Sequence, residues 1–170
     1  MNNPHNTIEY YIEHLNLLPH PEGGYYKETF RSKGIIPQSA LPEGFAGDRN
    51  FSTSIYFLLP GDTFSAIHRI HSDETWYYHA GNKLELWMLC DGGNLTKVII
   101  GPDIANGEFL QYTVPAECWF ASKSCNTNGF TLVGCQVAPG FDFNDFILAD
   151  REIILHQFPQ YKDFIMAFTR

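Results

Sequence analysis

Residues 61–81, GDTFSAIHRIHSDETWYYHAG, are the stretch that most constrains the fold. They divide into two strand-like runs, 64–70 and 75–80, bounded by turn residues at 60–62 and 81–82. Three histidines and Glu74 lie within the stretch. Because alternate side chains of a strand point to the same side, the pattern predicts that some of these titratable groups face the interior of a β structure.

Further strand-like runs surround this stretch, at residues 25–30, 51–59, 84–90, 95–100, 108–114, 118–122 and 130–138. Pairs such as Asn106-Gly107 and Asn128-Gly129 separate them and supply the positive φ angles that tight hairpins need. Residues 32–50 are polar and rich in Gly and Pro, which predicts a long loop. About nine closely spaced strands indicate a sandwich or barrel rather than alternating β and α units.

Helices are predicted at both ends of this β region. Asn6 and Glu9 have the spacing of a capping box, and residues 8, 11, 12 and 15 place apolar side chains on one face, which predicts a helix over about 7–17. Apolar residues at helical spacing predict short C-terminal helices over about 150–168. With a barrel over about 23–149 and no linker or repeat, the sequence predicts one domain, residues 1–170.

The bulk composition narrows the classes of partner. A net charge of −8 and a pI near 5.2 argue against nucleic acid, because the phosphate backbone would be repelled. No run of 18 apolar residues is present, so we expect no membrane partner. The first residues lack the basic start and apolar run of a secretory signal. We therefore expect a cytoplasmic protein.

Four cysteines are spread over the predicted β region, at Cys90, Cys118, Cys125 and Cys135. No two of them form a C-x-x-C pair, and three lie in apolar, strand-like surroundings. Such cysteines are typical of reduced, buried thiols in a cytosolic protein rather than of a zinc site.

Residues 61–81 resemble the first sequence motif of the cupin superfamily. That motif is a glycine, then H-x-H, then Glu, then a closing glycine, and the resemblance implies a barrel whose interior holds a divalent transition metal. His68, Glu74 and Gly81 stand at matching positions, whereas the second histidine position holds Ile70. His71 is one residue further on and would point to the opposite face of a regular strand.

A second cupin-like motif runs from Gly107 to Phe120. Its histidine position falls on Phe120, and its usual glycine is replaced by Glu117. Two of the four expected metal ligands are therefore missing, and a site of one His and one Glu binds metal weakly. We predict no cofactor. The alternative left open is a divalent transition metal held by His68, Glu74 and a displaced histidine, His71 or His79.

Several other runs resemble one branch of the cupins, the branch long catalogued as a cupin-like domain of unknown function. The matching runs are residues 20–32, 72–76, 79–81, 114–116 and 137–143, and the resemblance spans about residues 7–158. It implies a mainly β fold, a double-stranded β-helix or jelly-roll barrel, commonly a homodimer. It also implies similarity in fold to dTDP-sugar 3,5-epimerases, which by itself establishes no reaction.

The candidate site is the barrel interior around His68 and Glu74, the predicted catalytic pair. If Glu74 points inward, Trp76 and Tyr78 share its face, and His68 lies alongside on the neighbouring strand. A buried His and carboxylate beside aromatic walls bind a sugar or heterocycle and move protons. The predicted ligand-binding residues are Glu28, Arg31, Trp76, Tyr78, His79 and Phe120. Arg31 is a candidate to bind a phosphate or carboxylate, or to form a cross-strand ion pair with Glu28.

Three hypotheses about function follow from this site. The first is a small-molecule-binding cupin, acting on a sugar-like or nucleotide-sugar-like ligand as a metal-independent isomerase or epimerase. The second is a metal-dependent cupin enzyme that uses His68, Glu74 and a displaced histidine. The third is a ligand-binding or sensing module without catalysis. The sequence does not decide whether the protein is an enzyme, and it names neither substrate nor reaction.

Overall fold

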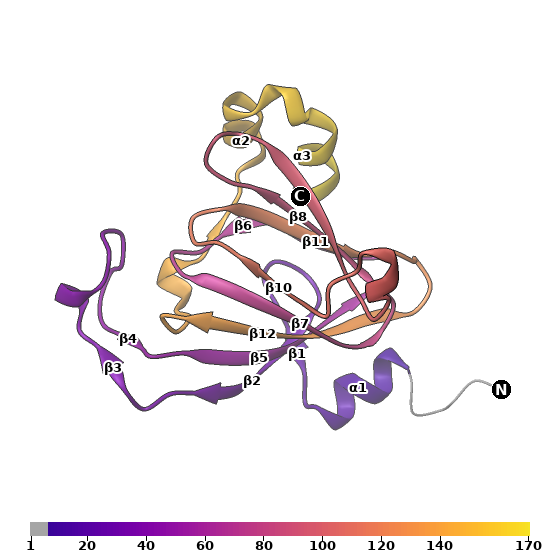
Figure 1. Cartoon of the computed structure of the whole chain (residues 1–170), viewed down its shortest axis with the longest axis horizontal. Helices are drawn as coiled ribbons and strands as arrows, with labels where there is room; N and C mark the ends of the chain where they lie inside the picture. Colours follow the sequence, from indigo (N-terminus) through magenta and orange to yellow (C-terminus); the bar gives the residue numbers. More distant parts are fainter. Residues whose placement is uncertain (1–6) are drawn as a thin grey trace.

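The computed structural model describes residues 7–170 as two antiparallel sheets packed face to face (Figure 1). Its strands are β1 Leu18–Pro19, β2 Tyr25–Arg31, β3 Ile35–Ile36, β4 Arg49–Asn50, β5 Thr53–Pro60, β6 Phe64–Arg69, β7 Asp73–Gly81, β8 Leu84–Leu89, β9 Leu95–Ile100, β10 Gln111–Val114, β11 Trp119–Ser124, β12 Phe130–Ala138 and β13 Ile147–Leu148. One sheet has the order β1-β2-β5-β12-β7-β10, and the other β13-β6-β11-β8-β9. The predicted mainly β jelly-roll architecture with terminal helices is confirmed.

The core lies between the two sheets. Alternating side chains of the facing strands bury large rings there, including Phe57, Trp76 and Phe120, each about 1% exposed. Strand β12 is the centre of the larger sheet, since it pairs with β5 along one edge and with β7 along the other. The chain-adjacent strands β6 and β7 belong to different sheets, so residues close in sequence approach the interior from opposite walls.

Three short helices cover the outer faces. Helix α1, Ile8–His14, packs against the larger sheet, while α2, Arg151–Gln157, and α3, Lys162–Phe168, pack against the smaller one (Figure 1). The predicted capping residue Asn6 lies outside the described residues; in the structure Thr7 is the N-cap, and its hydroxyl accepts a hydrogen bond from the Tyr10 amide at 3.2 Å. None of the helices among residues 7–170 has the length and apolar character to cross a membrane.

The segment 32–50, predicted to be a loop, contains a small sheet of β3 and β4 and a 3-10 turn at Gln38–Ala40. It projects from one end of the barrel (Figure 1). A buried ion pair fixes its return to the body, because Arg49 Nε donates to Asp145 Oδ2 at 2.6 Å. Asp145 lies in the segment between β12 and β13, ahead of the C-terminal helices.

The expectation of reduced thiols is wrong for two of the four cysteines. Cys90 follows β8 and Cys118 precedes β11, and these strands are antiparallel neighbours in which Leu89 faces Trp119. This register brings the two Cα atoms to 4.3 Å, and the side chains form a disulfide. Cys125 and Cys135 are free, the first exposed and the second buried.

Candidate functional site

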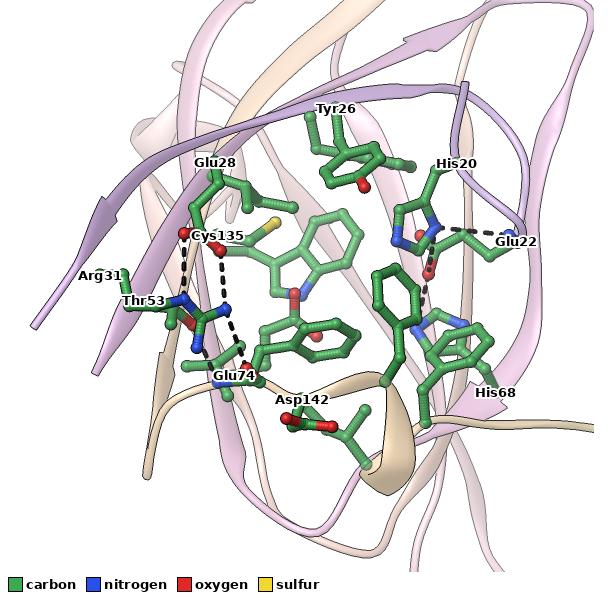
Figure 2. A pocket seen from close by; sticks show the side chains of 18 residues that line it. His20, Glu22, Tyr26, Glu28, Arg31, Thr53, His68, Glu74, Cys135 and Asp142 are labelled. Carbon is green, nitrogen blue, oxygen red and sulfur yellow. Dashed lines mark hydrogen bonds and ion pairs between the residues drawn. The ribbon is translucent and has the colours of Figure 1, made fainter. Parts of the chain in front are cut away.

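A cavity of about 310 Å³ lies at one end of the barrel, between the sheets (Figure 2). Its wall comes from β2, β5, β6, β7 and β12, from the turn before β2, and from the segment after β12. The lining residues are His20, Glu22, Tyr26, Glu28, Arg31, Thr53, Ile55, Phe57, His68, Ile70, Glu74, Trp76, Cys135, Val137, Phe141, Asp142, Phe143 and Phe146. Aromatic and aliphatic side chains dominate this wall, with a few polar groups among them, as is usual for small-molecule sites.

His68 is paired with Glu22 and not with Glu74, which corrects the predicted pair. His68 Nε2 lies 3.1 Å from Glu22 Oε2, and His68 Nδ1 lies 2.7 Å from the Ala66 carbonyl oxygen. The predicted pairing placed β6 beside β7, whereas the two strands are in different sheets. His68 and Glu74 therefore line the same cavity from separate walls.

Burial disfavours an ion pair between His68 and Glu22. Burial lowers the pKa of His68 to about 4 and raises the pKa of Glu22, so both groups favour their neutral forms. His68 donates its Nδ1 hydrogen to the Ala66 carbonyl, which leaves Nε2 as an acceptor. Glu22 Oε2 lies at this nitrogen, and Ser65 donates to the other Glu22 oxygen at 2.8 Å.

His20 extends this cluster toward the cavity. The Glu22 backbone amide donates to His20 Nδ1 at 3.3 Å, so the ring hydrogen of the neutral imidazole lies on Nε2. Burial lowers the pKa of His20, which favours the neutral form. In Figure 2 the His20 ring lies beside Tyr26, with its second nitrogen toward the cavity. His20 is therefore a neutral hydrogen-bond donor on the cavity wall.

Glu74 is the second proton-carrying group. Burial, and after it the nearby Glu22 carboxyl, raise its pKa to about 8, although Cys135 and Trp76 act to lower it. The carboxyl is thus mostly protonated at neutral pH. The Trp76 indole N–H lies near enough to influence Glu74, yet it is buried and makes no hydrogen bond of acceptable geometry with any described residue.

Arg31 forms a structural clamp at the cavity rim. Its Nε and Nη2 donate to the two Glu28 oxygens at 3.0 and 2.7 Å. Its Nη1 donates to Asn50 Oδ1 at 2.9 Å, and Nη2 also donates to the Phe141 carbonyl at 3.1 Å. These contacts, drawn in part in Figure 2, tie β2 to the segment after β12. The structure therefore contains the ion pair between Arg31 and Glu28, which is one of the two roles predicted for Arg31.

The predicted ligand-binding residues divide between the cavity and other places. Glu28, Arg31 and Trp76 lie on the cavity wall. Tyr78 does not line the cavity; it packs against the same interior core cluster as Trp76, and its hydroxyl donates to the Gly81 carbonyl at 2.7 Å.

Two further predicted residues lie away from the cavity. His79 is on the outer face of the larger sheet, where its ring lies 5.7 Å from that of Tyr56. Phe120 packs behind His68, with ring centroids 4.0 Å apart, and is buried in the core instead of lining the cavity. His79 has the opposite parity on β7 to Glu74 and Trp76 and faces outward, whereas Phe120 faces the interior but lies in the core beyond the cavity.

The donor set does not suit the metal-dependent hypothesis. His71 is paired with Glu117 outside the cavity, and His79 lies on the outer sheet face, so neither joins His68 and Glu74. Within residues 7–170, no group of three or more His, Cys, Asp or Glu side chains is arranged to hold a metal ion. His68 also has both ring nitrogens engaged, and a metal ligand needs a free lone pair.

The sequence over residues 9–149 matches the family described as Cupin superfamily (DUF985). The chain belongs to the cupin superfamily. The protein YML079W of Saccharomyces cerevisiae is 33% identical to this cupin over 156 residues, covering 85% of this chain and 76% of the yeast protein.

Solved structures agree with this assignment. A hypothetical protein from Leishmania major has a TM-score of 0.87 at 36% identity, covering 96% of this chain and 99% of its own. Protein SO0799 from Shewanella oneidensis has a TM-score of 0.84 at 39% identity, with 100% and 99% covered. Oxalate decarboxylase from Bacillus subtilis, at 16% identity and a TM-score of 0.54 over 88% of this chain and 36% of its own, shares the fold.

His20, Glu22 and the phenylalanines after β12 are site residues that the sequence reasoning did not select. A signal was present, because residues 20–32 and 137–143 were two of the runs that carried the family resemblance. These residues show no hydrophobic periodicity, because they lie in turns and irregular segments. The sequence therefore does not indicate whether their side chains face the interior.

Proposed function

We propose that this cupin binds a small sugar-like molecule inside the barrel and isomerises or epimerises it by proton transfer without a metal. The observation that carries the proposal is one cavity with proton-carrying groups on separate walls: the His20–Glu22–His68 cluster and Glu74 (Figure 2). Aromatic rings between them suit the apolar face of a sugar ring. The volume lies near the lower limit for ligand sites, which favours a single ring over a nucleotide sugar.

The proton transfer proceeds in two steps on a carbon next to a carbonyl. The ionised form of Glu74 removes the C–H proton, and the electron pair moves to the carbonyl oxygen, which takes a hydrogen bond from His20 Nε2. Glu74 then returns the proton to the neighbouring carbon, while that carbon's former carbonyl oxygen takes up the hydroxyl proton of the carbon that first lost its hydrogen, which becomes the new carbonyl. Epimerisation instead requires that the same carbon receive its proton from the opposite wall. A general base works best when its pKa is near the working pH, and a pKa of about 8 meets that condition.

Hydrogen exchange tests this proposal. The protein is incubated in D₂O with D-glucose, D-mannose, D-fructose and D-glucosamine, and NMR measures deuterium entering carbon positions. We expect exchange into at least one sugar, lowered by about 10² or more in Glu74→Gln. Glu85→Gln, a carboxyl-to-amide change on β8 outside the cavity wall, is the matched control and should leave exchange unchanged. Absence of exchange into every sugar, or full exchange in Glu74→Gln, would overturn the proposal.

A further inference from the structure

The charges around the cavity are unbalanced. Four carboxyl groups line it, from Glu22, Glu28, Glu74 and Asp142, and among the lining residues only Arg31 carries a permanent positive charge. Arg170 influences Glu22 from outside the cavity wall, where its guanidinium donates to the Phe64 carbonyl. Burial raises the pKa values of Glu22 and Glu74, which favours their neutral forms, and Glu28 is paired with Arg31, so Asp142 is the carboxylate on this wall that a positively charged ligand would meet.

An anionic ligand has no free partner at the rim. The Arg31 guanidinium is held by both Glu28 oxygens, by Asn50 and by the Phe141 carbonyl, so its charge is neutralised and most of its donors are used. A phosphate or carboxylate would have to displace Glu28 and would still face Asp142. The cavity therefore disfavours the nucleotide-sugar ligands considered from the sequence.

The rim has the components that recognise an organic cation. Asp142 Oδ1 accepts a hydrogen bond from the Asn144 amide at 2.9 Å, and Asp142 lines the same cavity as Phe141, Phe143 and Phe146. Phe141 and Phe143 have ring centroids 5.0 Å apart, and Phe146 lies 6.2 Å from Phe143. The faces of such rings attract ammonium groups, and a carboxylate beside them adds a direct ion pair.

A second feature points to the other end of the ligand. The Trp76 indole N–H is buried, lines the cavity and has no hydrogen-bond partner among the described residues. A buried donor without a partner is costly, and a ligand oxygen would satisfy it. We infer that the ligand is a cyclic amino alcohol of the amino-sugar class, with its ammonium group beside Asp142 and the phenylalanine rings and a hydroxyl at Trp76. This inference rests on the proposed small-molecule site.

Three probes that share one ring and one hydroxyl test the charge of the ligand. They are trans-4-aminocyclohexanol, trans-1,4-cyclohexanediol and trans-4-hydroxycyclohexanecarboxylate, compared by calorimetric titration of the full chain at pH 7. We expect the ammonium probe to bind at least tenfold more tightly than the diol, and the carboxylate probe to bind most weakly. Equal binding of the ammonium probe and the diol, or tightest binding of the carboxylate, would overturn the inference.

Two variants test whether Asp142 is the residue that causes the preference for the ammonium probe. Asp142→Asn should reduce the advantage of the ammonium probe over the diol to less than threefold. Asp91→Asn, a matched change in the exposed turn after β8, should keep the tenfold advantage. An advantage that survives in Asp142→Asn contradicts the assignment. Diol binding without any charge preference refutes this inference alone, whereas failure of all three probes and of the sugars to bind refutes the proposed function as well.

Discussion

Replacing Glu74 by Gln should change how the stability of the fold depends on pH, by an amount set by the burial of the carboxyl group. The pKa of Glu74 is about 8 in the folded chain against 4.5 as its ordinary value. A tenfold change in proton affinity corresponds to about 1.36 kcal/mol, so ionising Glu74 costs the folded state roughly 4 to 5 kcal/mol. Glutamine has the same shape and does not titrate, so the variant avoids this cost.

The direction of the pH dependence follows from whether the folded or the unfolded chain keeps the Glu74 proton. Below pH 4.5 the carboxyl is neutral in both the folded and the unfolded chain, and it adds no pH dependence. Between pH 4.5 and 8 the unfolded chain loses the proton and the folded chain keeps it, so the free energy of unfolding falls as pH rises. His68 acts in the opposite direction between pH 6.5 and 4, but it is common to both proteins and cancels in their difference.

Urea unfolding followed by tryptophan fluorescence at pH 5, 6, 7, 8 and 9 measures this difference. The free energy of unfolding of Glu74→Gln relative to the natural sequence should rise by roughly 4 kcal/mol between pH 5 and 8, and then level off. Glu85→Gln should show a difference that changes by less than about 1 kcal/mol over the same range, since Glu85 is on β8 outside the cavity. A Glu74→Gln difference as flat as that of the control would refute the assignment of a buried, protonated carboxyl.

Three other perturbations have expected outcomes. Asp145→Asn leaves the buried Arg49 charge without its carboxylate and should lower the free energy of unfolding by about 3 to 5 kcal/mol in urea titrations; a loss below about 1 kcal/mol would mean that the pair is hydrated. Gly81→Ala should cost roughly 1 to 3 kcal/mol in the same assay, because φ is +85° and the added Cβ would collide with the Phe130 carbonyl; an unchanged midpoint would contradict that contact. Cys90→Ser should cost about 3 to 4 kcal/mol without reductant and nothing with it, as the disulfide to Cys118 closes a loop of 28 residues; equal losses in both conditions would exclude the disulfide.

The strands could be predicted because their signals are local. Alternation and turn residues located all nine predicted strands, and 95–100 and 130–138 match β9 and β12 at both ends. The short strands β1, β3, β4 and β13 were not predicted, since two residues carry no period. The disulfide was missed for a related reason: the cysteines are 28 residues apart, and only the pairing of β8 with β11 brings them together.

The site could be predicted only in part. Local alternation placed Glu74 and Trp76 on one face, and both line the cavity. It also placed Tyr78 on that face, where the ring packs against the interior core cluster, but it did not show that Tyr78 lies beyond the cavity. It also gave no information on the partner of His68, because Glu22 comes from a turn 46 positions earlier in the chain and approaches through the packing of two sheets.

The residues that replace the two missing motif histidines account for the chemistry that remains. Phe120 packs against the His68 ring, and Ile70 adds an aliphatic side chain to the cavity wall, so His68 and Glu74 are surrounded by apolar groups where the motif would place further ligands. Desolvation is the largest influence on both pKa values, and it disfavours the charged carboxylate on which a metal ion depends. Glu22 then takes the Nε2 position of His68 that a metal would occupy. The same substitutions that remove metal donors therefore leave Glu74 as a mostly neutral acid whose pKa of about 8 lies near neutral pH, and this is the property that the proposed metal-free proton transfer requires.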